Sequence, residues 1–177
     1  MIKKVQFREE QQFRQMWVWV IILIIVGVWF YGVIQQVLIG KSFGNNPTSD
    51  TVLILFGIIP LLLIYLIFKL KLITIVDKEG VHCRFSPLQR KAKAILPDDI
   101  SEYYIRQYKP IAEYGGWGVR RGLRKYGNAY NVTGKIGMQF ILKDGKKFLI
   151  GTQKADSLKR ALDKLMDNKQ LRENLNQ

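Results

Sequence analysis

The sequence contains few of the residues on which small enzyme and metal sites are commonly built. Its 177 residues include one cysteine, Cys83, and one histidine, His82. One cysteine excludes an internal disulfide and fits a reducing compartment, and this pair cannot supply the usual ligand set of a zinc site. Adjacent residues on a strand point to opposite faces, so these two side chains cannot act as base and nucleophile. We therefore expect a protein that is not an enzyme and has no catalytic residue, cofactor or metal.

Charged residues are missing from two long stretches near the N-terminus, Met16–Leu38 and Val52–Phe68. A hydrocarbon core about 30 Å thick needs about 20 helical residues, so each stretch is long enough to cross it. The remaining residues, 69–177, could not cover two helices that are apolar on every side. The sequence predicts a transmembrane hairpin over residues 16–68, and Pro60 is expected to bend its second span.

Acidic residues are scarce relative to basic ones, and the imbalance predicts an orientation. The chain has 28 Lys+Arg against 14 Asp+Glu, a net charge of +14. Residues 69–177 hold 23 Lys+Arg against 11 Asp+Glu, or +12, residues 1–15 carry +2, and the connector 39–51 is neutral. Positive charge stays on the cytoplasmic side of a membrane. We therefore expect both termini in the cytoplasm and the short connector outside.

The segment that precedes the first span, residues 1–15, is polar. We expect it to form a short cytoplasmic helix that leads into the membrane, and a surface-lying amphipathic anchor is the alternative. No linker follows the second span, so residues 69–177 are expected to form a cytoplasmic domain that begins at the bilayer.

Strand patterns fill most of that domain, and a helix pattern ends it. The alternation of Val81, Cys83 and Phe85 with polar residues is typical of a half-buried strand. The strands are expected at residues 70–76, 81–85, 93–96, 102–108, 129–133, 138–143 and 147–151. Within residues 155–175, the apolar positions Leu158, Ala161, Leu162, Leu165 and Met166 share one helical face. The sequence thus predicts about seven antiparallel strands and a C-terminal α-helix.

Three motifs carry a resemblance to a known family. They are EYGGWGVR at Glu113–Arg120, GNAYNVTG at Gly127–Gly134 and FLIGTQKADSL at Phe148–Leu158. Together they resemble the bacterial PH-like (pleckstrin-homology-like) domain family, and in particular small bacterial membrane proteins in which a helical hairpin precedes one such domain. The resemblance implies a membrane α-helical hairpin plus a β-rich PH-like barrel at the bacterial cytoplasmic (inner) membrane. It implies no reaction, and the phosphoinositide binding of eukaryotic PH domains does not follow from it.

Basic and aromatic residues alternate through the region 106–126. The candidate contacts for lipid or a partner are Arg106, Lys109, Tyr114, Trp117, Arg120, Arg121, Arg124 and Lys125. Cations near an anionic leaflet contribute about 1 kcal/mol each, and aromatic rings suit the headgroup level. In the alternative interpretation, the glycines shape a tight loop, Trp117 closes the end of the barrel and the cations form a solvated rim. No recognised motif supports nucleic-acid binding.

These observations favour a non-catalytic function. We expect a scaffold or adaptor that holds a protein partner, or a second copy of itself, at the inner leaflet. The alternative is a sensor that binds anionic lipid or another anionic ligand through the basic aromatic loop.

Overall fold

The computed structural model describes residues 5–122 and 125–175. The chain divides into a helical unit, Arg14–Lys69, and a β-rich unit that combines Met1–Phe13 with Leu70–Gln177. The β-rich unit is therefore built from segments on both sides of the helical unit.

The helical unit contains two apolar helices that match the predicted spans. The first comprises α1 (Met16–Val33) and the π-helical turn η1 (Ile34–Leu38), and the second comprises α2 (Asp50–Phe56) and α3 (Ile58–Lys69). By length and composition each is able to cross a membrane, and only 11% of each apolar window is buried within the protein. Their apolar surfaces are thus left largely uncovered by the chain itself.

The second helix is interrupted at Gly57, one turn before Pro60. The proline has no N–H to donate, and its ring crowds the carbonyl four residues earlier, so the regular hydrogen bonding stops there. Trp29 packs against Gly57, where a Cβ would overlap its ring. The Trp29 indole donates a hydrogen bond of 3.0 Å to the Leu53 carbonyl. The second helix is thus interrupted close to Pro60, the predicted bend stays a prediction, and Trp29 links the two helices beside the interruption.

The β-rich unit contains two sheets. Sheet A has the order β1-β2-β3-β4 and sheet B the order β5-β8-β9-β7-β6. The strands of sheet A are β1 (Phe7–Gln12), β2 (Lys71–Val76), β3 (Val81–Ser86) and β4 (Lys93–Ile95). Those of sheet B are β5 (Ile100–Gln107), β6 (Gly118–Arg121), β7 (Asn128–Asn131), β8 (Ile136–Leu142) and β9 (Lys147–Gly151). Three helices complete the unit: η2 (Pro97–Asp99), α4 (Pro110–Tyr114) and α5 (Ala155–Leu175).

This architecture corrects part of the predicted fold. The described residues form nine strands rather than about seven, and β7 pairs with β9 in parallel while the other pairs are antiparallel. The two sheets do not join into a closed barrel among these residues. The additional strands are β1 and β6, which were missed because β1 is rich in charge and β6 lies in a glycine-rich passage.

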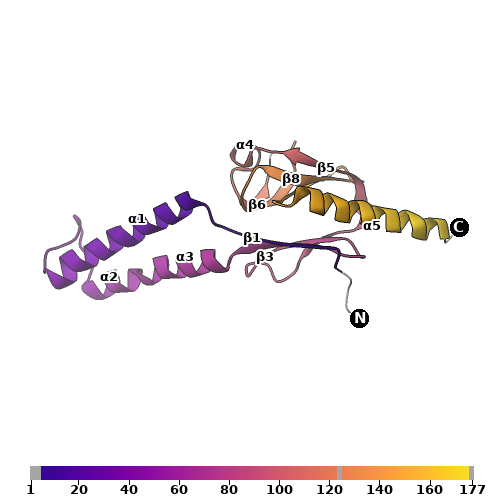
Figure 1. Cartoon of the computed structure of the whole chain (residues 1–177). Helices are drawn as coiled ribbons and strands as arrows, with labels where there is room; N and C mark the ends of the chain where they lie inside the picture. The colour runs from indigo at the N-terminus through magenta and orange to yellow at the C-terminus, as the bar shows by residue number, and fades with distance from the viewer. Residues whose placement is uncertain (1–4, 123–124, 176–177) are drawn as a thin grey trace. The chain divides into compact units, whose positions relative to one another are not determined.

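A single main core joins both sheets and α5. Leu72 and Phe85 of sheet A, Met138 and Phe140 of sheet B, and Leu162 of α5 all belong to it and are almost fully buried. The helix α5 contacts β1 and β2 of sheet A and β5 and β8 of sheet B (Figure 1). Apolar side chains on alternate strand positions therefore meet the apolar face of the helix, as the two periods predict.

The N-terminal segment is the largest departure from the sequence interpretation. The predicted polar helix is wrong, because residues 7–12 form β1 and pair antiparallel with β2 from Phe7↔Val76 to Gln12↔Lys71. On the inward face, Glu9 and Gln11 are buried. A search for apolar alternation could not find this strand, because two of its three inward positions are polar.

Hydrogen bonds explain how that polar face is tolerated. The Glu9 carboxylate accepts from the Thr152 hydroxyl at 2.6 Å and from the Gln153 amide at 2.9 Å. The Gln11 side-chain amide donates to the Gly151 carbonyl at 2.7 Å. Buried polar groups are stable only when such partners are present. The inward face of β1 can therefore be buried only against the segment between β9 and α5, which supplies these partners.

Candidate functional site

The structure assigns Arg106 to an internal network rather than to an open surface. Arg106 lies on β5. Its Nε donates a hydrogen bond to the Gln139 side-chain oxygen at 2.9 Å, and its Nη2 donates one to the Tyr114 hydroxyl at 2.9 Å. Its Nη1 forms an ion pair of 2.8 Å with Glu113. The guanidinium is thus used to hold α4 against sheet B.

Tyr114 is a second member of this network. It is buried, its hydroxyl donates to the Tyr126 carbonyl at 3.3 Å, and its ring lies 6.0 Å from that of Tyr108. Burial raises the pKa of Tyr114, so the hydroxyl stays protonated at neutral pH. Gly115 ends α4 in the left-handed conformation, which glycine adopts at low cost. Two of the candidate residues, Arg106 and Tyr114, therefore support the site rather than line its surface.

A hollow of about 610 Å³ opens beside α4 and is called the α4 hollow below. Trp117 and Ile111 supply apolar surface, and Lys109 and Lys135 supply positive charge. Ile111 is 70% exposed, which is a high fraction for a large aliphatic side chain. The complete lining is Gln107, Tyr108, Lys109, Pro110, Ile111, Ala112, Glu113, Trp117 and Lys135. Such a lining suits an apolar group that is accompanied by negative charge.

The strand β6 follows Trp117 directly and forms one edge of sheet B. Within the described residues it pairs only with β7. Its last three side chains, Val119, Arg120 and Arg121, are exposed. The Arg120 Nε donates to the Trp117 carbonyl at 2.7 Å, which fixes this guanidinium at the strand edge. An edge strand offers main-chain groups to an incoming strand, and here two cations accompany them.

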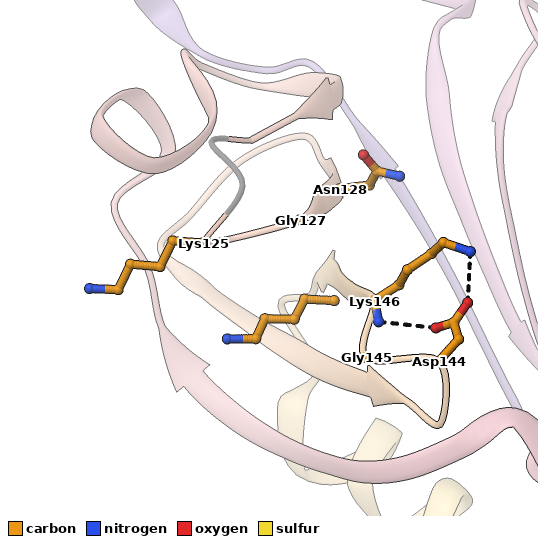
Figure 2. Close-up of a pocket in the computed structure, with 7 residues that line it drawn as sticks. Lys125, Gly127, Asn128, Asp144, Gly145 and Lys146 are labelled. Atoms are coloured by element: carbon orange, nitrogen blue, oxygen red, sulfur yellow. Dashed lines mark hydrogen bonds and ion pairs between the residues drawn. The ribbon is translucent and has the colours of Figure 1, made fainter.

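The remaining candidates, Arg124 and Lys125, separate from this group. Arg124 lies outside the described residues. Lys125 is exposed, with its ammonium 5.9 Å from the Tyr126 ring centroid. It lines a different hollow of about 500 Å³, called the basic hollow below (Figure 2). The basic hollow is lined by Lys125, Gly127, Asn128, Asp144, Gly145, Lys146 and Lys147.

The predicted loop is therefore three separate features: an internal brace, the α4 hollow with the β6 edge, and the basic hollow. The sequence interpretation missed Ile111 and Lys135 at the second, and Lys146 and Lys147 at the third. The lysine pair after the Asp144-Gly145 turn was a signal that could have been used. The turn near Gly127 lies beside this lysine pair only because β7 pairs with β9, a strand that comes later in the sequence.

The other chemistry-bearing residues belong to local structure. The Asp77 carboxylate accepts from the Glu79 and Gly80 amides at 2.8 and 3.2 Å and contacts His82 Nε2 at 3.2 Å. Burial alone would raise the pKa of Asp77, but these hydrogen bonds and His82 outweigh it and lower the pKa from 3.8. Asp77, Glu79 and His82 are metal-ligand residue types with donor atoms within 4.8 Å of one another. The shared contacts of Asp77 show that this group closes the β2–β3 turn.

Cys83, next to His82, points into the core and is fully buried. Burial raises the pKa of this thiol to about 12, so it stays protonated and unreactive at neutral pH. The expected separation of the two side chains is confirmed by the alternating burial along β3.

No protein-family model matches the chain, and no curated protein sequence matches it. The geometry of the exposed features therefore carries the functional argument.

Proposed function

We propose that the protein is a non-catalytic, membrane-anchored adaptor whose β-rich unit binds an extended acidic segment of a protein partner along β6. The observation that carries this proposal is the edge of β6, which among the described residues pairs only with β7 and carries two exposed arginines. An extended peptide can add to such an edge through main-chain hydrogen bonds, and its side chains then provide specificity.

The charges at β6 specify the chemistry of the partner. Arg120 and Arg121 are consecutive, so they project to opposite faces of the strand. Carboxylates placed at matching positions of an added strand would meet one guanidinium on each face. Arginine binds carboxylates in a planar, two-bond arrangement that lysine cannot reproduce.

The α4 hollow extends the same surface. Trp117 lines the hollow and is followed at once by Gly118, the first residue of β6. A partner strand that pairs with β6 can therefore place an apolar side chain against Trp117 and Ile111. The partner is therefore expected to present an extended segment that carries acidic residues and one large apolar residue.

The two apolar helices support a membrane location for this adaptor. We infer that they span the bacterial cytoplasmic membrane with both termini inside, because the positive charge of the chain is concentrated in residues 69–177. We also infer a relationship to PH-like domains. Two sheets that share a core with a C-terminal helix support that relationship, although the nine strands of the described residues and their lack of closure depart from the barrel the resemblance implies.

A second candidate function is binding of an anionic lipid surface through the α4 hollow. The exposure of Ile111, between the cations of Lys109 and Lys135, favours it, because apolar and basic groups together suit the membrane interface. The two candidates differ in which molecule lies next to β6.

A photo-crosslinking residue at Val119 tests the proposal in native membranes, since this side chain is 47% exposed between Trp117 and the arginines. We expect a covalent adduct with a protein, and peptide mapping should locate it in an acidic segment. In the Arg120→Glu, Arg121→Glu background the yield should fall about tenfold or more, because charge reversal places like charges opposite one another.

The matched control is Arg160→Glu with Lys164→Glu, which makes the same charge change on exposed positions of α5. It should leave the adduct unchanged. Adducts with lipid alone would overturn the adaptor and favour the second candidate. A protein adduct that survives reversal at β6 would also overturn the proposed recognition.

A further inference from the structure

The basic hollow lies between two turns of sheet B, next to the end of β6, where Asn128 pairs with Arg121. One wall is formed by residues 125–128, which lead into β7, and the other by residues 144–147, which lead from β8 into β9. Parallel pairing of β7 with β9 aligns Asn128 with Phe148 and so holds the two turns side by side. The hollow is therefore mounted on paired strands.

Glycine at position 127 allows the two turns to approach each other. Gly127 has a φ of +74°, and a Cβ at this position would overlap the carbonyl of Lys147. Its own carbonyl accepts a 2.7 Å hydrogen bond from the Gly122 amide. Any larger residue would separate the walls of the hollow, because it would need both a strained backbone and more space.

The hollow and its surroundings have an excess of positive charge. Lys125, Lys146 and Lys147 line it together with one acid, Asp144. A neighbouring hollow of about 220 Å³ shares Asp144 and Lys146 and adds Lys93, Lys143 and Asp99. Five lysines and two aspartates thus line two adjoining depressions. Clefts lined by charge of one sign concentrate the field and attract the opposite ion.

Asp144, the one acidic residue that lines the basic hollow, forms its contacts with Lys146. The Lys146 ammonium lies 2.7 Å from Asp144, and the Lys146 amide also donates to this carboxylate at 3.0 Å. Figure 2 shows Lys146 folded back onto Asp144, while Lys125 extends from the other turn. Hydrogen bonding within this pair lowers the pKa of Asp144 and raises that of Lys146. Lys125 and Lys147 form no ion pair among the described residues, so their charges are available to a ligand.

We propose that the basic hollow binds a phosphate monoester group, with Lys125 and Lys147 as its charge partners. Lysine binds phosphate as a point charge, and a volume of about 500 Å³ holds a phosphate with an attached glycerol or sugar. The monoester can belong to a lipid headgroup or to a soluble metabolite. This site adjoins the end of β6 but uses different cations from the β6 edge, and it does not depend on the adaptor function.

Calorimetric titration of the full chain tests the site. In non-ionic detergent micelles the probe is glycerol 3-phosphate, and in nanodiscs it is phosphatidate against a phosphatidylcholine background. We expect saturable binding of at least one probe. Tighter binding of glycerol 3-phosphate than of phosphatidate identifies a soluble ligand, whereas tighter binding of phosphatidate identifies a lipid headgroup.

Two variants locate the binding. Lys125→Gln with Lys147→Gln should weaken it about 30-fold, since each cation near an anion contributes about 1 kcal/mol, or about fivefold. The control, Arg160→Gln with Lys164→Gln, removes the same charge from α5 and should change the affinity less than about twofold. No saturable binding of either probe, or equal affinities in the two variants, would overturn the proposal.

Discussion

The strands β1 and β6 are both edges of a sheet, but their side chains are used in opposite ways. Along β1, every second residue is buried, and two of the buried residues are polar groups with hydrogen-bond partners far along the chain. Along β6, no side chain is buried, and the last three are exposed. The comparison shows that the position of a strand in a sheet does not decide its role. The role of an edge strand is decided by the contacts that its inward-facing side chains make.

This difference follows from what each strand contributes to the core. Phe7 of β1 belongs to the main core, and Glu9 closes the segment that leads into α5. β6 contributes no residue to either buried cluster, so its side chains are free for recognition. Substitutions in β1 should therefore change stability, and substitutions in β6 should change binding.

The largest effect is expected from Glu9→Ala. The substitution removes an acceptor from the Thr152 hydroxyl and the Gln153 amide, and unsatisfied groups at buried positions cost about 2 to 3 kcal/mol in total. The purified full-length protein in detergent should melt about 10 °C lower by circular dichroism. Glu9→Gln keeps one acceptor oxygen, so its melting temperature should lie between those of the unsubstituted protein and Glu9→Ala. An unchanged melting temperature in Glu9→Ala would remove the structural role assigned to β1.

A smaller, pH-dependent effect is expected from Glu10→Gln on the outward face of β1. Hydrogen bonds from Lys71 and then Arg8 lower the pKa of Glu10 from 4.5. Because the pKa is depressed in the folded state, the stabilisation is present above pH 4.5 and is lost as the pH falls through the folded value. The substitution should lower the free energy of unfolding by about 0.5 kcal/mol at pH 7.

Melting curves at pH 7 and in the acid range check this expectation. The difference between the two proteins should shrink as the pH falls below 4.5. A difference that grows in acid would contradict the ion pairs assigned to Glu10.

The smallest effect on stability is expected at β6. Arg120→Ser with Arg121→Ser removes two exposed side chains that contribute nothing to the core. The free energy of unfolding should therefore change by less than about 0.5 kcal/mol, while the crosslink at Val119 falls sharply. A loss of stability comparable to that of Glu9→Ala would mean that β6 is a structural edge like β1.

The sequence was sufficient for the elements whose pattern is apolar and local. The first span was predicted to its residue bounds, and the alternation of Val81, Cys83 and Phe85 matches the buried face of β3. On α5, the predicted face is buried at Leu158, Ala161, Leu162 and Leu165. In each case burial against the core follows directly from the spacing of apolar residues.

The features that could not be predicted depend on partners distant in sequence. From the sequence, Glu9 is indistinguishable from a surface charge. The groups that hydrogen-bond it, on Thr152 and Gln153, are 143 and 144 residues later in the chain. The candidate loop read as one basic surface, but the contacts of Arg106 with Gln139 and Tyr114 remove it from that surface. The basic hollow arises from a parallel pairing of β7 with β9 that no local pattern indicates.

The pairing of β1 with β2 has a consequence for biosynthesis. During translation the first strand emerges early, yet its ladder partner follows both apolar helices, and the contact with Thr152 comes later still. At about 5 to 20 residues per second, the Glu9 carboxylate waits roughly 7 to 30 s for that hydroxyl. Completion of the β-rich unit is thereby delayed until the hairpin has been synthesised. A fragment that begins at residue 69 would expose the bare flank of β2, so its behaviour would not represent that of the intact protein.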